Sequence, residues 1–121
     1  MPKNKENENA YDFKNAKYIE TYDGDTFYVD IPSLHPIFGQ RLGVRIKGID
    51  TPEIRSSNKY EKLLGKKAKA ETEKILESSK KIVLKNCTKG TFSRIVCDIE
   101  TDTCEDLGKH LIENGFAEKY E

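Results

Sequence analysis

The chain has 121 residues, of which 35% are charged, and its 21 basic residues balance 21 acidic residues to a formal net charge of zero. A chain of this length is expected to fold as one domain with a modest core. A strongly basic composition, which would indicate bulk binding of nucleic acid, is excluded, so any polyanion must bind at a local site.

Residues 1–11 are rich in Asn, Lys and Glu, which bury too little apolar surface to offset the entropy cost of ordering them. We expect a disordered lead-in over 1–11 and one folded domain over 12–121. No hydrophobic signal core or membrane-length apolar run is present, so we expect no membrane partner. Localisation stays open between a cytosolic protein and a secreted or periplasmic one from which a signal peptide was removed.

The first half of the chain is typical of β-strands. Alternating runs at 18–22 and 26–31 flank an Asp-Gly pair, which predicts a hairpin. Two prolines and a glycine predict a loop at 32–40. A third strand is expected at 42–47, and its alternation places Arg45 on the face opposite the core.

The second half predicts two helices and two further strands. Apolar residues at helical spacing predict a helix over 61–78, and strands follow at 81–85 and 94–99. A last helix is expected over 105–114, ending before Gly115. This order predicts a β-rich α+β fold, a five-stranded OB-fold Greek-key barrel with two to three helices.

The chain contains three cysteines and no closely spaced pair. This odd count argues against a disulfide framework, and we expect Cys87, Cys97 and Cys104 to be small buried apolar residues. A link between Cys97 and Cys104 across a hairpin is the alternative. The two histidines, His35 and His110, have no ligand spacing relative to the cysteines, which argues against zinc.

Two acidic turns and two arginines form a candidate site. Asp25 shares the strand phase of the apolar residues that follow it, so its carboxylate needs a partner, and a cation is one. Asp50 and Glu53 occupy a second turn shortly after Arg45, and Arg94 lies further along the chain. Carboxylates can hold a hard cation and activate water, and arginines can bind phosphate and neutralise its charge.

Taken singly, each of these residues has an ordinary structural explanation. Asp25 and Asp50 suit turns, and Glu53 suits a solvated loop. Arg45 and Arg94 suit surface ion pairs. It is their combination that indicates a metal–phosphate site.

Several motifs along the chain carry a family resemblance. They are Asp23-Gly24-Asp25-Thr26, Arg45, Gly48-Ile49-Asp50-Thr51-Pro52-Glu53, Gly65 with Ala68, Phe92-Ser93-Arg94, and Leu111 with Gly115-Phe116-Ala117. In this order and spacing they resemble the staphylococcal nuclease (thermonuclease) family over residues 17–119. The chain departs from that family at the run and the loop around Arg94. Tyr120 is the aromatic residue that remains to stack on substrate.

The resemblance implies a calcium-dependent nuclease that hydrolyses DNA and RNA with low sequence specificity and leaves 3′-phosphates. It implies that the metal is held by Asp25, Asp50 and the carbonyl of Thr51. It implies that the catalytic residues are Glu53, as general base or water-orienting group, and the phosphate-binding arginines Arg45 and Arg94. We expect a monomer. The alternatives are a catalytically silent OB-fold nucleic-acid-binding domain and a domain that only stores a cation.

Overall fold

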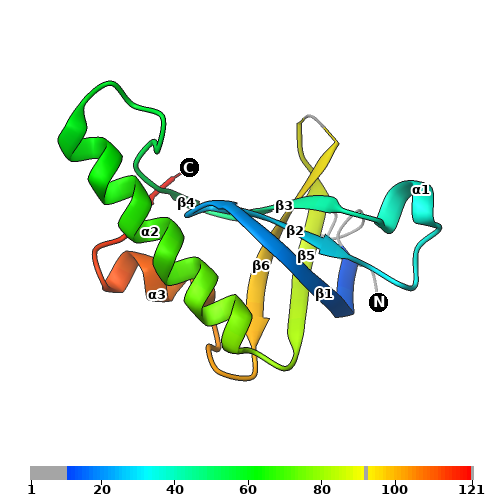
Figure 1. Ribbon diagram of the computed structural model, residues 1–121. Coiled ribbons are helices and arrows are strands. Elements are labelled where there is room, and N and C mark those ends of the chain that lie inside the picture. The colour runs from blue at the N-terminus through cyan, green and yellow to red at the C-terminus, as the bar shows by residue number, and fades with distance from the viewer. Residues whose placement is uncertain (1–10, 92, 121) are drawn as a thin grey trace, which may run out of the picture.

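The computed structural model describes residues 11–91 and 93–120 and contains a closed barrel of five strands in the order β1-β2-β3-β6-β5 (Figure 1). The barrel strands are β1 (Tyr11–Asp23), β2 (Thr26–Asp30), β3 (Leu42–Ile46), β5 (Ile82–Lys89) and β6 (Arg94–Thr101). Neighbouring strands are antiparallel except for β3 and β6, which are parallel. The predicted β-rich α+β barrel of OB type is confirmed.

The helices are α1 (Pro36–Gly39), α2 (Lys59–Ser78) and α3 (Leu107–Glu113). The short helix α1 lies in the segment that was predicted as a loop, and its first residue is a proline, which suits a helix start. The strands β4 (Ile49–Asp50) and β7 (Glu118–Lys119), two residues each, pair with one another and were not predicted. None of the helices in the described ranges is long and apolar enough to cross a membrane.

Strand β1 is longer than predicted, because it serves as a partner to two strands. Its first half pairs with β5 and its second half with β2, with register shifts in both pairings. These register shifts interrupt the regular alternation of inward and outward side chains, so the sequence pattern does not predict the first half of β1. The strand begins at Tyr11, so this residue does not belong to the expected lead-in, and residues 1–10 lie outside the described residues.

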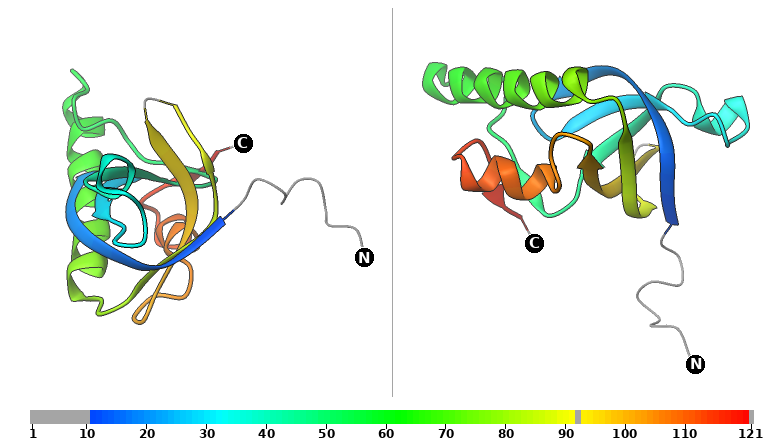
Figure 2. Two further views of the ribbon diagram at one scale, coloured as in Figure 1. Left: turned by 90° about the vertical axis from the view of Figure 1, so that its right-hand side faces the viewer. Right: turned by 90° about the horizontal axis from the view of Figure 1, so that it is seen from below.

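Helices α2 and α3 lie together at one end of the barrel (Figure 2). The Glu71 carboxylate of α2 lies 2.6 Å from Nε2 of His110 on α3 and joins the two helices. The barrel interior and the helix faces share one apolar core. Its fully buried members include Phe27, Val44, Ile46, Leu84, Ile99, Leu107 and Leu111. The core therefore holds the ends of β2 and β3 against the helices, where the acidic turns lie.

The expectation of three unpaired cysteines was wrong. Cys87 and Cys97 form a disulfide between the adjacent strands β5 and β6, with their Cα atoms 4.2 Å apart. Both residues are buried, as expected, and Cys104 is unpaired. The pairing depends on a register shift in β5 that follows Lys85, and spacing along the chain does not reveal such a shift.

The Cys87–Cys97 disulfide predicts how many free thiols the oxidised protein contains. Thiol titration in denaturant without a reductant should report one thiol per chain, from Cys104. After reduction it should report three, and the free energy of unfolding should fall by about 2–4 kcal/mol, because the cross-link constrains the unfolded chain. Three reactive thiols before reduction would contradict the pairing.

Candidate functional site

The turn between β1 and β2 holds Asp25 at the end of the barrel. The residue is only 6% exposed and follows the strand phase of Phe27, as the sequence predicted. Its Oδ1 accepts a hydrogen bond from the Thr26 hydroxyl at 3.1 Å, and its Oδ2 accepts one from the Thr51 backbone N–H at 3.2 Å. The second of these bonds joins the two acidic turns.

Arg45 lies between the carboxylates of both turns. It extends from β3, and its Nη2 lies 3.3 Å from Asp50 Oδ1 and 3.5 Å from Asp25 Oδ2. Its Nη1 donates a hydrogen bond to the Ile49 carbonyl at 3.0 Å, which fixes the guanidinium against the backbone. The Tyr120 ring covers it, with its centroid 5.5 Å from the guanidinium carbon. The structure therefore brings Asp25, Arg45, Asp50 and Thr51 together.

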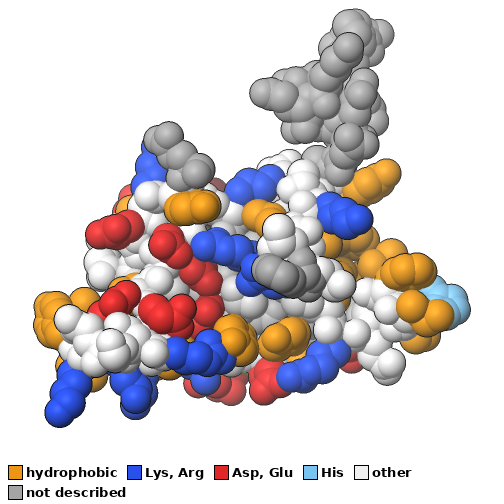
Figure 3. Space-filling model, turned by 90° about the horizontal axis from the view of Figure 1, so that it is seen from above, with side chains coloured by type: hydrophobic (Ala, Val, Ile, Leu, Met, Phe, Trp, Pro, Cys, Tyr) orange, Lys and Arg blue, Asp and Glu red, His pale blue; other side chains and the backbone are white. Residues whose placement is uncertain are grey.

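Carboxylates outnumber cations in this group. Burial and the neighbouring Asp25 raise the pKa of Asp23 to about 7. Burial and the Asp25 charge also raise the pKa of Asp50 above its ordinary value. Burial opposes ionisation of Asp25 as well, but Asp23 and Arg45 outweigh it and hold the Asp25 pKa below its ordinary value. Acidic and basic side chains gather side by side on the face seen in Figure 3.

Sequence reasoning assigned no role to Asp23, although it is the first acid of the Asp-Gly-Asp turn. Its Oδ1 accepts a hydrogen bond from the backbone N–H of Asp25 at 3.1 Å. The Asp-Gly-Asp motif could have indicated a role for Asp23. The burial that raises the pKa of Asp23, however, depends on the folded turn. We therefore add Asp23 to the acidic group.

Helix α2 packs unusually close to the first acidic turn. A Cβ atom at Gly24 would lie 2.8 Å from the Ala68 Cβ and 2.8 Å from the Thr51 side chain, so no larger residue fits there. The Thr72 hydroxyl donates a buried hydrogen bond of 2.7 Å to the Gly24 carbonyl. The small face of α2 thus positions the turn that carries Asp25.

The same helix face positions the loop after Asp50. A Cβ atom at Gly65 would lie 2.7 Å from the Pro52 carbonyl oxygen and 3.0 Å from the Ile54 nitrogen. Asn58 caps the helix, because its Oδ1 accepts a hydrogen bond from the Glu61 N–H at 3.0 Å. The loop that contains Glu53 is therefore held between the second acidic turn and the start of α2.

Glu53 and Arg94 lie apart from the contacting group. The exposed Glu53 carboxylate accepts a hydrogen bond from the Arg55 N–H at 3.0 Å and lies 3.9 Å from the Arg55 guanidinium. Arg94 donates two bonds of 3.4 Å to Thr91, one to its carbonyl and one to its hydroxyl. Within the described ranges, neither residue forms a hydrogen bond or ion pair with Asp25 or Asp50.

The strand register nevertheless places both arginines on one face. Gly43 of β3 pairs with Arg94 of the parallel strand β6, and Arg45 is two residues further along β3. Side chains two residues apart on a strand point to the same side, so Arg45 and Arg94 share the outer face. Phe92, which precedes Arg94 in the family motif, lies outside the described residues.

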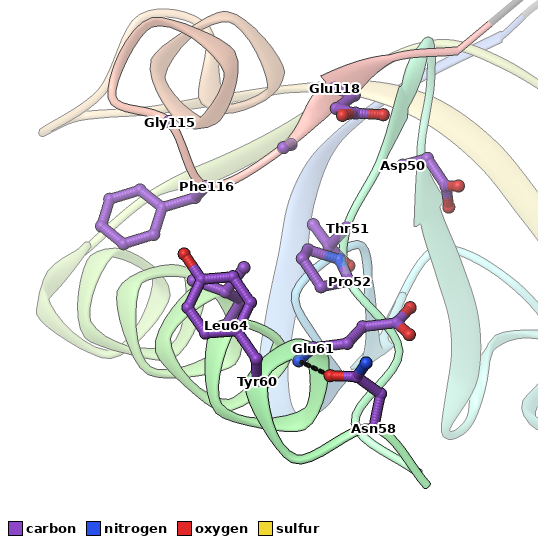
Figure 4. Close-up of a pocket in the computed structure, with 11 residues that line it drawn as sticks. Asp50, Thr51, Pro52, Asn58, Tyr60, Glu61, Leu64, Gly115, Phe116 and Glu118 are labelled. Atoms are coloured by element: carbon purple, nitrogen blue, oxygen red, sulfur yellow. Dashed lines mark hydrogen bonds between the residues drawn. The ribbon is translucent and has the colours of Figure 1, made fainter. Parts of the chain in front are cut away.

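A cleft of about 400 Å³ is lined in part by the second acidic turn (Figure 4). Tyr60 and Leu64 of α2 and Phe116 after α3 form its apolar wall. In Figure 4 the Asp50 carboxylate points away from the Tyr60 and Phe116 rings. Asp50 and Thr51 also line the cleft, so it adjoins the group formed by Asp25, Arg45, Asp50 and Thr51. Sequence reasoning did not predict this apolar wall, because it depends on the packing of two distant segments.

The donor type at the acidic turns fits a hard cation. Two carboxylates lie within 3.5 Å of the same cationic nitrogen of Arg45, and Asp23 carries a third beside them. In the described ranges, however, no three or more His, Cys, Asp or Glu side chains are grouped closely enough to hold a metal ion by themselves. Calcium takes roughly six to eight oxygen ligands, so water and a phosphate would have to complete the shell around Asp25 and Asp50.

Comparison with known families identifies the chain. A family model described as staphylococcal nuclease homologue matches residues 43–121, which is more than half of the chain. The chain belongs to this family, and the family supports a nuclease-like or nucleic-acid-binding function on the OB-type barrel. The matched range contains Arg45, Asp50, Thr51, Glu53 and Arg94. Asp25 precedes that range and joins the group through its contacts with Arg45 and Thr51. A search of curated proteins found no match.

The close approach of α2 can be tested at Gly65. Gly65→Ala should lower the free energy of unfolding by about 1 kcal/mol, measured by urea denaturation. Overpacking against the Pro52 carbonyl costs about 1–3 kcal/mol, and the gain in helix propensity returns about 1 kcal/mol.

The matched control is Lys66→Ala, an exposed neighbour on the same helix, which should change stability by no more than about 0.5 kcal/mol. A Gly65→Ala protein that is more stable than the parent would show that the loop yields to the added methyl group.

Proposed function

We propose that the chain is a calcium-dependent nuclease that hydrolyses phosphodiester bonds of DNA and RNA with low sequence specificity. A water molecule attacks phosphorus, the bond to the 5′-oxygen breaks, and a 3′-phosphate and a 5′-hydroxyl result. The observation that carries the proposal is the contact of Arg45 with carboxylates from two separate turns. Family membership supports the same class of function.

The proposed metal ligands are Asp25, Asp50 and the carbonyl of Thr51. Bound calcium would polarise a phosphate oxygen and neutralise part of the charge that develops on it. The surplus of carboxylates supports this assignment, because burial and mutual repulsion raise the pKa values of Asp23 and Asp50 in the protein alone. A divalent cation would stabilise the ionised forms of both groups.

The proposed role of Arg45 and Arg94 is to bind the scissile phosphate. A guanidinium donates two parallel hydrogen bonds to phosphate oxygens, and both become stronger as negative charge develops. Arg94 is available for this role, because its bonds to Thr91 are long at 3.4 Å. Arg45 would exchange its contacts with Asp25 and Asp50 for the phosphate when a cation takes over these carboxylates.

The proposed role of Glu53 is to accept a proton from the attacking water or to orient it. Its ion pair with Arg55 is exposed and spans 3.9 Å, and exposed pairs contribute at most about 1 kcal/mol. Rotation of Glu53 towards the scissile phosphate is therefore inexpensive. Because all of these groups contact phosphate or water and none contacts a base edge, sequence specificity is expected to be low.

A calcium titration of DNA cleavage separates the metal ligands from the base. Asp50→Asn should weaken calcium binding, and excess calcium should partly restore its rate. Glu53→Gln should bind calcium and substrate normally but cleave about 10²–10⁴-fold more slowly at every calcium concentration. Both side chains are more than half exposed, so both variants should fold.

The unmodified protein in excess chelator is the control, and it should not cleave. Full activity in chelator would refute the calcium requirement. Binding of nucleic acid without cleavage at any calcium concentration would identify the alternative, a catalytically silent OB-fold domain.

The phosphate-binding role predicts that Arg94→Ala lowers kcat/KM by about 10²–10³-fold while stability stays near that of the parent. Arg94→Lys should recover only part of this loss, because an ammonium group lacks the planar pair of donors. Lys89→Ala, at an exposed position of the neighbouring strand β5, is the charge-matched control and should cleave normally. Normal turnover by a folded Arg94→Ala protein would remove Arg94 from the mechanism.

A further inference from the structure

Two tyrosines lie next to one another on the outer face of the barrel, beside the acidic turn. Tyr22 belongs to β1 and directly precedes Asp23, and Tyr28 belongs to the adjacent strand β2. Their rings meet edge to face, with centroids 6.4 Å apart and an interplanar angle of 84°. Tyr22 is 40% exposed, so an aromatic surface is presented to solvent close to Asp25.

An arginine covers each ring. The guanidinium carbon of Arg55 lies 4.4 Å from the Tyr22 centroid, and that of Arg41 lies 4.5 Å from the Tyr28 centroid. Both arginine side chains are more than half exposed, and each also contacts a carboxylate on the surface. Exposed ion pairs and cation–π contacts each contribute about 1 kcal/mol or less, so both arginines can leave the rings at low cost.

This pair of tyrosines is continuous with the proposed active site at two points. Gly43 pairs with Tyr28 on one side and with Arg94 on the other. A Cβ atom at Gly43 would lie 2.9 Å from Arg94 Cγ and 3.6 Å from Tyr28 Cε1, so these two side chains converge over the glycine. At the other end, Arg55 contacts both the Tyr22 ring and the Glu53 carboxylate.

We propose that Tyr22 and Tyr28 stack the bases of a single-stranded polynucleotide that continues from the scissile phosphate across the outer faces of β1 and β2. This inference rests on the proposed function and names its substrate class. A base that replaces a guanidinium on a tyrosine gains a stacking contact, and the displaced Arg41 or Arg55 gains a phosphate. Displacement of Arg55 also releases Glu53 from its ion pair.

Duplex nucleic acid is a poor ligand for this surface. Its bases are stacked on one another and present only their edges in the grooves, whereas a single strand can place its base faces on aromatic rings. Stacking does not distinguish one base from another, because every base has a π-face. The surface therefore adds affinity for unpaired strands without adding sequence specificity.

The test measures binding of a labelled 12-nucleotide single strand in chelator, where no cleavage is expected, by fluorescence anisotropy. DNA and RNA strands form separate arms, and a DNA duplex of equal length is the comparison. Tyr22→Leu and Tyr28→Leu should each weaken single-strand binding about tenfold or more, and duplex binding should change little. Tyr28→Phe should bind normally, because it keeps the ring.

Tyr11→Leu is the matched control, since Tyr11 is 65% exposed at the far end of β1, and it should bind as the parent does. Weaker binding of either the DNA or the RNA single strand by the Tyr22→Leu and Tyr28→Leu proteins supports the inference and identifies which type of strand the tyrosines bind. Unchanged binding of both strands, or an equal loss for the duplex, overturns it.

Cleavage in calcium separates this inference from the proposed function. For Tyr22→Leu and Tyr28→Leu, the loss of kcat/KM on the 12-nucleotide strand should exceed the loss on a dinucleotide by about tenfold. If the parent protein cleaves nothing, the proposed nuclease function fails, and the binding measurements still decide the role of the tyrosines. If the parent cleaves, and the variants have the same ratio of kcat/KM on the 12-nucleotide strand to kcat/KM on the dinucleotide as the parent, only the tyrosine inference fails.

Discussion

The arrangement of the site depends on the close packing of α2 against two acidic turns. Gly24 and Gly65 have no Cβ to separate the helix from the turns, and Ala68 contributes only a methyl group. The buried Thr72 hydroxyl replaces the hydrogen bond that water would otherwise make to the Gly24 carbonyl. A rigid helix thus holds two turns from different strand pairs at a fixed separation, which brings Asp25 within reach of the second turn.

This separation creates a local excess of negative charge in a chain whose net charge is zero. Asp25 and Asp50 both contact the guanidinium of Arg45, and Asp23 lies beside Asp25. The raised pKa values of Asp23 and Asp50 reflect their burial and the nearby Asp25 carboxylate. Repulsion between the crowded carboxylates destabilises the folded protein. Such electrostatic strain is common where a protein binds a cation or a charged substrate. The excess of carboxylates supports the proposal of a cation at this site, and Arg45 and Arg94 share the adjoining outer face of the barrel.

The position of Arg94 depends on a different part of the structure. Strand β6 begins at Arg94, pairs in parallel with β3 and is linked to β5 through Cys87 and Cys97. The disulfide and the ladder fix where Arg94 leaves the sheet, while its weak bonds to Thr91 leave the guanidinium free to reorient. A fixed backbone with an adjustable side chain would suit the proposed role of Arg94 in binding phosphate.

The sequence by itself determined the barrel class, the buried phase of Asp25 and the family, because alternation, turn residues and motif spacing are local properties of the chain. It did not reveal the first half of β1, the Cys87–Cys97 pair or the Tyr22–Tyr28 surface. Each of these depends on a register shift or on contacts between strands and loops that are distant in sequence. Tertiary structure also decided which acids meet Arg45, because Asp25 lies on a different turn, 20 residues before it in the chain.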